Sequence, residues 1–307
     1  MAANRVPEAV IGVDVGGSGV RAARVGADGA VIGPVVRVGL GDRSRNGVLG
    51  HVVELVTALT RHHPARAVGV GLPAFLRQPD GTVTLAPNLP DLNGWPAAAA
   101  LRAAIDLPCV VENDADAAAF GEYWAGREKP DPFIYLGLGT GLGGGVVLGG
   151  QVLHGARGMA AELGHLTVWP EGARCGCGAR GCVEAYASAV GIARAYHEAT
   201  GESQTAEEIA RRAHGGDPHA RVAYTVAGRA LGIAVAQLVH VFNPALVAIG
   251  GGIAQAWELF EPAMTAEVAA RTPAAMRDGL QVRRAGLGAD AGVIGAAGLA
   301  WRTLARA

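Results

Sequence analysis

Three cysteines that lie within eight positions of the sequence could hold a metal ion. Cys175, Cys177 and Cys182 occupy a glycine-rich segment, and His165 precedes Cys175 by ten residues. One imidazole and three thiolates make a closed tetrahedral zinc site, which leaves no position for water and therefore has a structural role. Three free thiols in a flexible loop are the alternative, but clustered exposed thiols are reactive and are rarely left unused. The spacing predicts a structural Zn2+ bound by these four residues.

The predicted zinc site would also position the polar side chains on either side of it. Glu162 lies shortly before His165, and Glu184 follows the last cysteine. If one ring nitrogen of His165 binds the ion, the other can donate a hydrogen bond outward. A neutral ligand rich in hydroxyl groups would suit that donor. Each glutamate could instead be a solvated surface carboxylate.

Glycines gather at three places where an apolar run ends. They lie at 16–17, 137–150 and 250–252, and only glycine lets the backbone approach a ligand closely at low cost. Residues 139–144 satisfy the pattern G-x-G-x-x-G, but a Rossmann dinucleotide site requires a helix next, and a strand is expected there. A hairpin turn with several N–H groups can instead hold phosphate oxygens. For any single cluster, a tight turn without a ligand is an equally good interpretation.

The three glycine clusters together favour a bound nucleotide. Asp14 precedes the first cluster and could hold hydrated Mg2+, which prefers one or two carboxylates together with phosphate oxygens. The third cluster follows an apolar strand and could hold the nucleoside. The residues predicted to bind the nucleotide and its Mg2+ are Asp14, Gly16, Gly17, Ser18, Gly139, Thr140, Gly141, Gly143, Gly144, Gly250, Gly251 and Gly252.

The elements that must position these residues are strands and helices in alternation. Strands are expected at 9–15, 20–25, 30–40, 67–72, 109–111, 132–137, 145–148, 151–153, 246–249 and near 281. Helices are expected at 48–62, 96–105, 115–124, 183–199, 206–213 and 217–242, from 256 and from 293. Residues 73–95 form a Pro-, Gly- and Asn-rich excursion with one short strand.

Each half of the chain begins with a strand, a glycine turn and a return strand, which indicates a duplication. The predicted fold class is α/β, and its duplicated plan resembles the actin and hexokinase architecture, a ribonuclease H-like fold with two domains flanking a cleft. We expect a small α/β domain at 1–115 and a larger one at 116–292 that carries the zinc loop. The terminal helix, 293–307, is expected to return to the first domain.

Composition argues against several other classes of protein. Half of the 307 residues are hydrophobic and the net charge is -1, so a broad basic surface for nucleic acid or anionic membrane is not expected. No apolar run is expected to reach the length that spans a bilayer, and residues 1–8 lack the pattern of a secretory signal. We therefore expect a soluble, cytoplasmic protein. Cys109 lies in an apolar run and is expected to be a buried core thiol.

Taken together, the motifs resemble the ROK family (repressors, open reading frames and sugar kinases), and its bacterial glucokinases in particular. The resemblance covers nearly the whole chain in matching order. The segments that carry it are DVGGSG at 14–19, ENDA at 112–115, LGTGLGG at 138–144, ELGH at 162–165, CGCGARGCVE at 175–184 and GGG at 250–252. The cysteine motif with its trailing glutamate is highly specific, whereas the glycine turns alone are not.

The resemblance implies ATP-dependent phosphorylation of a hexose at its primary (6-) hydroxyl, with glucose as the expected hexose. Asp114 would be the general base, and the resemblance assigns hydroxyl binding to Asn113, Asp114, Glu162, His165 and Glu184. Phosphoryl transfer depends mostly on positioning and charge stabilisation, with one carboxylate orienting the nucleophile. The alternative role for Asp114 is the N-cap of the helix expected from Ala115. The resemblance also implies a homodimer.

Some positions depart from the family pattern and leave the hexose open. Ser18 stands for the family's usual Thr, Gly19 for a common Lys and Asp116 for the second Asn of the usual sequence ENDAN. The segment Leu72–Leu76 differs from the family's more usual Pro-Gly-Pro sequence, which the resemblance places near the second carbon of the sugar. Fructose, mannose, allose, N-acetylglucosamine and N-acetylmannosamine therefore remain alternative substrates, and the phosphate donor could differ from ATP.

Three other functions are weighed against the kinase. A sugar-responsive repressor of the same family would need a helix-turn-helix domain, and only thirteen residues precede Asp14, with no basic stripe to replace it. A catalytically silent sugar or ATP sensor is disfavoured by Asp114. A zinc-ribbon interaction module does not explain the glycine turns.

Overall fold

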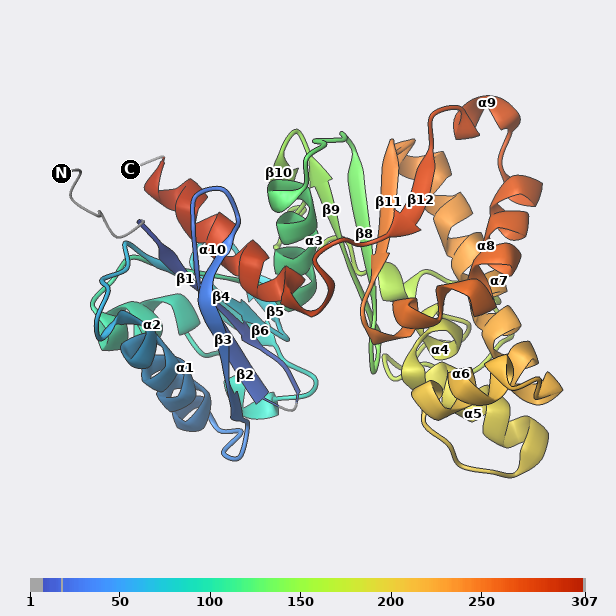
Figure 1. The fold of residues 1–307 in the computed structure, drawn as a ribbon, viewed down its shortest axis with the longest axis horizontal. Helices are drawn as coiled ribbons and strands as arrows, with labels where there is room; N and C mark the ends of the chain where they lie inside the picture. The colour runs from blue at the N-terminus through green and yellow to red at the C-terminus, as the bar shows by residue number, and fades with distance from the viewer. Residues whose placement is uncertain (1–7, 18, 306–307) are drawn as a thin grey trace. The chain divides into compact units, whose positions relative to one another are not determined.

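The computed structural model describes residues 8–17 and 19–305, and it divides into two compact units. The first unit contains Met1–Lys129, Gly150–Ala161 and Ala289–Ala307, and the second contains Pro130–Gly149 and Glu162–Gly288. Figure 1 shows that each unit is built around its own β-sheet with helices packed against it. Ser18, which is predicted to bind the nucleotide, lies outside the described residues.

The sheet of the first unit has the strand order β3-β2-β1-β4-β7. Its central strands are parallel, with β1 beside β4 and β4 beside β7, whereas β2 is antiparallel to both of its neighbours. The elements of this unit are β1 (Val10–Val15), β2 (Gly19–Val25), β3 (Val31–Gly39), α1 (Arg45–Thr60), β4 (Val68–Leu72), β5 (Phe75–Arg77), β6 (Thr82–Leu85), η1 (Pro90–Leu92), α2 (Ala97–Ile105), β7 (Cys109–Asn113), α3 (Asp114–Ala125), β10 (Gln151–Val152) and α10 (Ala291–Leu304).

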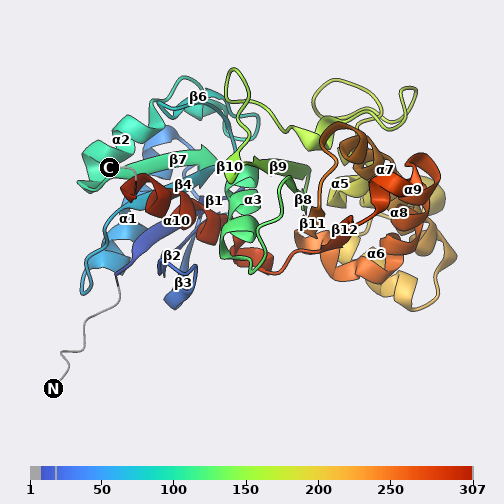
Figure 2. The same cartoon turned by 90° about the horizontal axis from the view of Figure 1, so that it is seen from above.

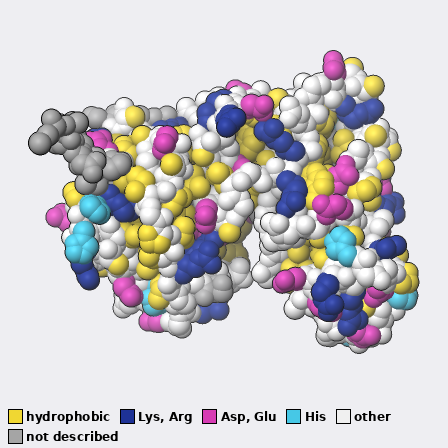
Figure 3. Space-filling model, in the orientation of Figure 1, with side chains coloured by type: hydrophobic (Ala, Val, Ile, Leu, Met, Phe, Trp, Pro, Cys, Tyr) yellow, Lys and Arg dark blue, Asp and Glu magenta, His cyan; other side chains and the backbone are white. Residues whose placement is uncertain are grey.

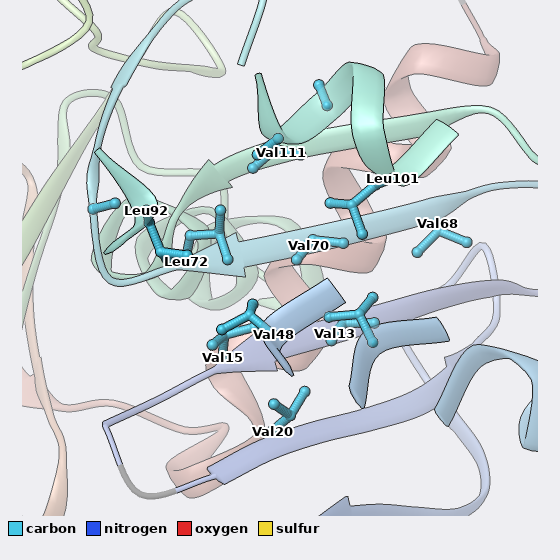
Figure 4. Close-up of a cluster of buried hydrophobic side chains, with 14 of the residues drawn as sticks. Val13, Val15, Val20, Val48, Val68, Val70, Leu72, Leu92, Leu101 and Val111 are labelled. Atoms are coloured by element: carbon cyan, nitrogen blue, oxygen red, sulfur yellow. The ribbon is translucent and has the colours of Figure 1, made fainter. Parts of the chain in front are cut away.

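One face of this sheet forms a valine-rich core with α1 and α2. Val13 and Val70 project from β1 and β4 toward Val48 of α1 and Leu101 of α2, and all four are buried (Figure 4). The strands β1 and β4 are almost entirely apolar and buried because both of their faces are covered, as in parallel strands of α/β proteins generally. Cys109 belongs to this cluster, as a partly buried side chain packed against it.

The other face is covered by α10, which runs alongside α3 (Figures 1 and 2). The backbone of α10 lies so close to β4 that a Cβ on Gly69 of β4 would lie 1.8 Å from the carbonyl oxygen of Ala296. A Cβ on Gly295 of α10 would lie 1.6 Å from the carbonyl oxygen of Ala117 in α3. Glycines at these positions therefore let two helices and a sheet pack backbone to backbone.

The second unit repeats the same strand plan. Its strands follow the order β9-β8-β11-β12, with β8 antiparallel to β9 and parallel to β11. This matches β2-β1-β4-β7 in order and direction, as a duplication predicts. The elements are β8 (Phe133–Leu138), β9 (Leu142–Leu148), η2 (Leu163–His165), α4 (Glu184–Ala187), α5 (Ala189–Thr200), α6 (Ala206–His214), α7 (Pro218–Phe242), β11 (Leu246–Gly250), η3 (Gly252–Ala256), α8 (Trp257–Arg271), α9 (Ala274–Arg277) and β12 (Gln281–Arg284). The short helix η4 (Gly288–Asp290) begins at the last residue of this unit and ends in the first unit.

Several expected elements differ in their bounds. The helix expected at 183–199 is two helices, α4 and α5, because Ser188 is extended and its hydroxyl accepts a hydrogen bond from the Gly191 N–H, which caps α5. The return strand β9 begins at Leu142 rather than at Gly145. The excursion at 73–95 holds a two-stranded hairpin, β5–β6, in place of one short strand.

The compact units also differ from the expected domain bounds. The expected boundary after residue 115 falls inside α3, whereas the first unit continues to Lys129 and takes up residues 150–161 as well. Packing of α3 against α10 keeps α3 in the first unit.

One helix, α7, is long and apolar enough to cross a membrane by length and composition, with a mean hydropathy of 1.5 in its most apolar window. The sequence expectation that no segment reaches this length does not hold for α7. Most of that window is buried inside the structure, where α7 packs against α8 and α5. Core helices of soluble proteins meet the same criterion, so this finding is weak evidence for a membrane span.

The contact between β4 and α10 predicts a strong dependence on Gly69. The change Gly69→Ala should lower the free energy of unfolding by at least about 2 kcal/mol, because the new methyl group meets backbone that cannot rotate away. Denaturant unfolding followed by circular dichroism measures this. A matched control is Gly50→Ala on the exposed side of α1, where a Cβ meets nothing within 4 Å. That change should raise stability by about 0.5–1 kcal/mol, and equal effects of the two changes would contradict the packing argument.

Candidate functional site

The first unit brings its predicted site residues to the carboxyl ends of its parallel strands. Asp14 of β1 is in register with Gly71 of β4, and Gly71 is in register with Glu112 of β7. A Cβ on Gly71 would lie 3.5 Å from the Cα of Asp114, so β4 passes close to the start of α3 at this point. Ligands of open α/β sheets bind at the carboxyl ends of strands.

Asn113 is both the last residue of β7 and the N-cap of α3. Its Oδ1 accepts hydrogen bonds from the N–H groups of Ala115 and Asp116, at 2.9 and 3.0 Å. Its Nδ2 donates to the carbonyl oxygen of Ala74 at 3.2 Å. The alternative role of Asp114 as the N-cap of a helix that begins at Ala115 is therefore wrong. Asp114 is instead the first residue of the helix, and its Oδ1 accepts from the Ala115 N–H at 2.8 Å.

Asp14 pairs with an arginine that the sequence analysis did not single out. Arg21 of β2 lies directly opposite Asp14 in the hairpin register, and its guanidinium donates to Oδ2 of Asp14. The other side of the carboxylate faces the start of α10, where a Cβ on Gly292 would lie 2.9 Å from Cγ of Asp14. The antiparallel register of β1 and β2 fixes this pairing, so the signal for Arg21 was present in the sequence.

The glycine turn of the first unit is closed by a backbone hydrogen bond and has free space beside Gly17. The Gly16 N–H donates to the carbonyl oxygen of Gly19 at 2.9 Å. Gly17 is exposed, and a Cβ there would meet nothing within 4 Å. Room for a ligand is therefore present at this turn.

The four predicted zinc ligands of the second unit come together. Their donor atoms all lie within 4.8 Å of one another. Sγ of Cys177 and Sγ of Cys182 are 3.7 Å apart, and Sγ of Cys175 lies 3.7 Å from Nδ1 of His165. Zinc bonds of about 2.3 Å to sulfur and 2.0–2.1 Å to nitrogen give tetrahedron edges of about 3.8 and 3.6 Å. The donor set therefore fits Zn2+.

Burial raises the pKa of the Cys175 and Cys182 thiols, whereas a hydrogen bond from the Ala179 N–H lowers the pKa of Cys177. A metal ion would displace the thiol protons, since zinc binds thiolates. The loop itself has little regular structure, with isolated bridges between Thr167 and Cys182 and between Arg174 and Arg180. A bound ion would thus stabilise a segment that secondary structure barely supports.

With Nδ1 of His165 directed at the thiols, its Nε2 faces Glu162, 4.0 Å from Oε2. Burial raises the pKa of Glu162, an effect that His165 opposes and Glu184 reinforces. Both residues flank or end the short helix η2, whose Gly164 packs on β9 so closely that a Cβ would lie 2.0 Å from the carbonyl oxygen of Leu142. The glycine therefore anchors Glu162 and His165 beside the second glycine turn.

Glu184 connects the cysteine cluster to that turn. Its Oε2 accepts from the Leu142 N–H at 3.0 Å, and its Oε1 accepts from the Cys175 thiol at 3.3 Å. A Cβ on Gly141 would lie 2.5 Å from Oε2, so a larger residue here would displace the carboxylate from the turn. The sequence indicated that Glu184 lies next to the cysteine motif, but it gave no signal for its hydrogen bond with the N–H of Leu142.

The turn at Gly139–Gly144 closes through a hydrogen bond from the Gly139 N–H to the carbonyl oxygen of Gly141, at 2.9 Å. Thr140 is exposed at its tip. Gly143 pairs with Gly137 across the hairpin, and a Cβ on Gly144 would lie 2.9 Å from Leu163. Part of this glycine content is thus explained by packing alone.

In the third glycine cluster, too, packing explains some of the glycines and not others. A Cβ on Gly250 would lie 2.5 Å from the hydroxyl oxygen of Tyr135. Gly251 has a φ of +83°, and a Cβ there would lie 2.3 Å from the carbonyl oxygen of Leu138. Packing and backbone conformation explain both. Gly252 meets nothing within 4 Å and is the member of the cluster that leaves space for a ligand.

The surface charge agrees with the near-neutral composition. On the face drawn in Figure 3, acidic and basic side chains are interspersed over both units rather than separated by sign. This distribution does not favour a polyanionic partner on that face.

The donor geometry predicts that the protein carries one zinc ion per chain. The change Cys177→Ser should abolish zinc binding, because serine is a poor replacement for a thiolate ligand. Elemental analysis of the purified protein measures the metal content. Cys109→Ala, which changes a thiol far from the cluster in sequence, is the control and should retain zinc. Equal zinc content in the two variants would contradict the assignment.

Comparisons with known proteins agree with these features. A family model described as "ROK family" matches residues 10–303. The glucokinase of Thermotoga maritima is 35% identical over 305 residues, covering 94% of this chain and 96% of that protein. An N-acetylmannosamine kinase of Escherichia coli is 34% identical, covering 94% and 97%. The crystal structure of a ROK family glucokinase from Streptomyces griseus in complex with glucose and AMPPNP is 33% identical, with a TM-score of 0.84 over 96% of this chain and 99% of that one. The chain therefore belongs to the ROK family and has its duplicated actin/hexokinase-like α/β fold.

Proposed function

We propose that the chain transfers the γ-phosphoryl group of ATP to the primary (6-) hydroxyl of a hexose, with glucose as the expected substrate. The observation that carries this proposal is the role of Asn113. Because Asn113 caps α3, the helix does not need Asp114 as its N-cap. The competing structural explanation for Asp114 is thereby removed, and a catalytic carboxylate at the carboxyl end of β7 is favoured.

In the proposed reaction, Asp114 accepts the proton of the hexose hydroxyl as the hydroxyl oxygen attacks the γ-phosphorus. A bond forms between that oxygen and phosphorus, and the bond from phosphorus to the β,γ-bridging oxygen breaks. ADP leaves with the electron pair, and Asp114 releases the proton to solvent. Such a reaction requires mostly positioning and charge stabilisation from the protein.

The nucleotide is proposed to lie against the glycine turns at 16–17 and 139–144, whose N–H groups suit phosphate oxygens. Asp14 would hold hydrated Mg2+, which neutralises phosphate charge when bound. Arg21, which pairs with Asp14, adds a second positive group beside the first turn. Gly252, with open space around it, is proposed to border the nucleoside. Gly250 and Gly251 would serve by packing.

The hexose is proposed to contact Asn113, Asp114, Glu162, His165 and Glu184. A structural zinc ion would hold His165 through Nδ1 and leave Nε2, which lies 4.0 Å from Glu162, to donate outward. Relatives named glucokinase and N-acetylmannosamine kinase are 35% and 34% identical to the chain, so the sugar's second carbon is where specificity needs testing. Asn113 donates to Ala74 and thereby ties the segment Leu72–Leu76 to the proposed base.

Three further proposals rest on family membership. We propose a homodimer, which light scattering after gel filtration would test, and a cytoplasmic location, as expected for a metabolic kinase. We also propose that no nucleic acid or membrane is a partner. The supporting observations are the mixed surface charge and the burial of α7.

The change Asp114→Asn should lower kcat by about 10²- to 10⁴-fold, the usual contribution of a positioned general base. ADP release coupled to a spectroscopic readout, with ATP and glucose, measures the rate. The control Asp106→Asn lies in the same unit, at an exposed left-handed helix end where asparagine is well tolerated, and should keep the wild-type rate. Near-normal turnover by Asp114→Asn would show that another group is the base.

The same assay with a panel of sugars tests the substrate. We expect the highest kcat/KM with glucose among glucose, mannose, fructose, allose, N-acetylglucosamine and N-acetylmannosamine. A preference for another member would correct the hexose while keeping the reaction. If the protein bound sugar and ATP but consumed no ATP with any of them, it would be a sensor rather than a kinase.

A further inference from the structure

A buried carboxylate next to the proposed base is held by donors from three separate segments. Glu112 is only 4% exposed. Its Oε1 accepts from the Asn113 N–H at 2.9 Å and from Nε2 of Gln78 at 3.2 Å, and its Oε2 lies 2.7 Å from Nε2 of His154. A buried charge needs such partners, because an unpaired one away from water is very unfavourable. None of the sequence motifs assigned a role to His154 or Gln78.

His154 belongs to the loop that follows β10, which packs on the end of β5. A Cβ on Gly158 of this loop would lie 2.2 Å from the carbonyl oxygen of Leu76. Gln78, two residues further along, donates to Glu112 and also to the carbonyl oxygen of Val111 at 3.1 Å. The loop, the β5 hairpin and the end of β7 are therefore joined at a single carboxylate.

The charged groups that the structure places around His154 come from three elements. They are Glu112 on β7, Asp116 on α3, which lies in the same group of side chains within 4.8 Å, and Arg302 on α10, whose guanidinium donates to the carbonyl oxygen of Gly150. The hydrogen bond to Glu112 raises the pKa of His154 although burial and Arg302 oppose it. Because both oxygens of Glu112 bind protein donors, an ion pair explains the group better than a metal site does.

We propose that the ion pair of His154 with Glu112 positions Asp114 for proton transfer. Glu112 fixes the N–H of Asn113, and Asn113 in turn binds the first-turn N–H groups of α3 through Oδ1. A displacement of Glu112 is therefore passed to the first turn of α3, which carries Asp114. Glu112 and His154 are positioning residues that act through Asn113, and this inference rests on the proposed kinase function.

The test compares His154→Ala and His154→Gln with the wild type over a range of pH. His154→Ala should lower kcat about tenfold, since small misplacements of a catalytic group cost rate, with the KM for ATP unchanged. Wild-type kcat should fall as pH rises through the pKa of His154, because a neutral imidazole binds the carboxylate less strongly. His154→Gln should lack this alkaline fall and stay low throughout. His62→Gln, an exposed histidine after α1, is the matched control and should behave as the wild type.

Proton NMR of the His154 ring provides a second measurement that does not depend on turnover. Its pKa should lie above the ordinary value of 6.5 in the wild type and return toward it in Glu112→Gln. Because the folded-state pKa is raised, the stabilisation is complete below pH 6.5 and is lost as pH rises through the folded-state pKa. The melting temperature of the wild type should therefore fall over that range, and that of His154→Gln should not.

The possible outcomes separate this inference from the kinase proposal. If the wild type phosphorylates a hexose and the His154 variants keep its kcat and pH profile, the inference is wrong and the proposed function stands. A lowered melting temperature without a changed pH profile of kcat would assign a purely structural role and would also overturn it. If the wild type phosphorylates no hexose, both proposals fall together.

Discussion

The junction between β7 and α3 is the constraint on which the first unit's candidate site depends. The chain leaves the sheet and enters a helix with no connecting residue, because Asn113 ends the strand and caps the helix at once. This forces Asp114 to be the first helical residue, at the carboxyl ends of the parallel strands. The sheet must also place Asp14 at the same level as the end of β7. It does so because Asp14 is in register with Gly71, and Gly71 is in register with Glu112. Close packing of α10 on Gly69 holds that sheet from behind.

The two units share a strand plan, but they differ in what their turns carry. In the first, Asp14 and Arg21 face each other across the hairpin, so the turn has charge of both signs beside it. In the second, the corresponding hairpin carries glycines at Gly137 and Gly143, and its carboxylate, Glu184, comes from a helix after the zinc loop. Duplication thus supplied two similar hairpins, and later elements gave each its own charged partners.

Much of this arrangement could be predicted from the sequence, because it depends on local patterns. The continuous apolar runs of β1 and β8 predict buried strands, and the Cys3His spacing predicts the donor set that the structure brings together. The break at Ser188 also had a local signal, a serine able to cap a helix. A hairpin of known turn length would likewise have placed Arg21 opposite Asp14.

Other features depend on tertiary contacts, and no local pattern reports them. His154 and Glu112 are 42 residues apart and meet only because the loop after β10 packs against β5. The division into units depends on α10 lying against α3 through Gly295. The assignment of Nδ1 of His165 to the thiols, and of Nε2 to the side of Glu162, is a matter of ring orientation that spacing alone leaves open.

The zinc loop and the second glycine turn are coupled through the two oxygens of Glu184. Oε1 accepts a hydrogen bond from the Cys175 thiol, and burial raises the pKa of that thiol. A zinc ion held by the three cysteines and His165 would keep Cys175 as a thiolate, which has no proton to donate. Oε1 would then lose a protein donor, whereas Oε2 accepts from the N–H of Leu142 independently of the thiol. Metal binding would therefore do more than hold the loop together, because it would release one carboxylate oxygen for a hydroxyl donor while the other keeps the side chain in place.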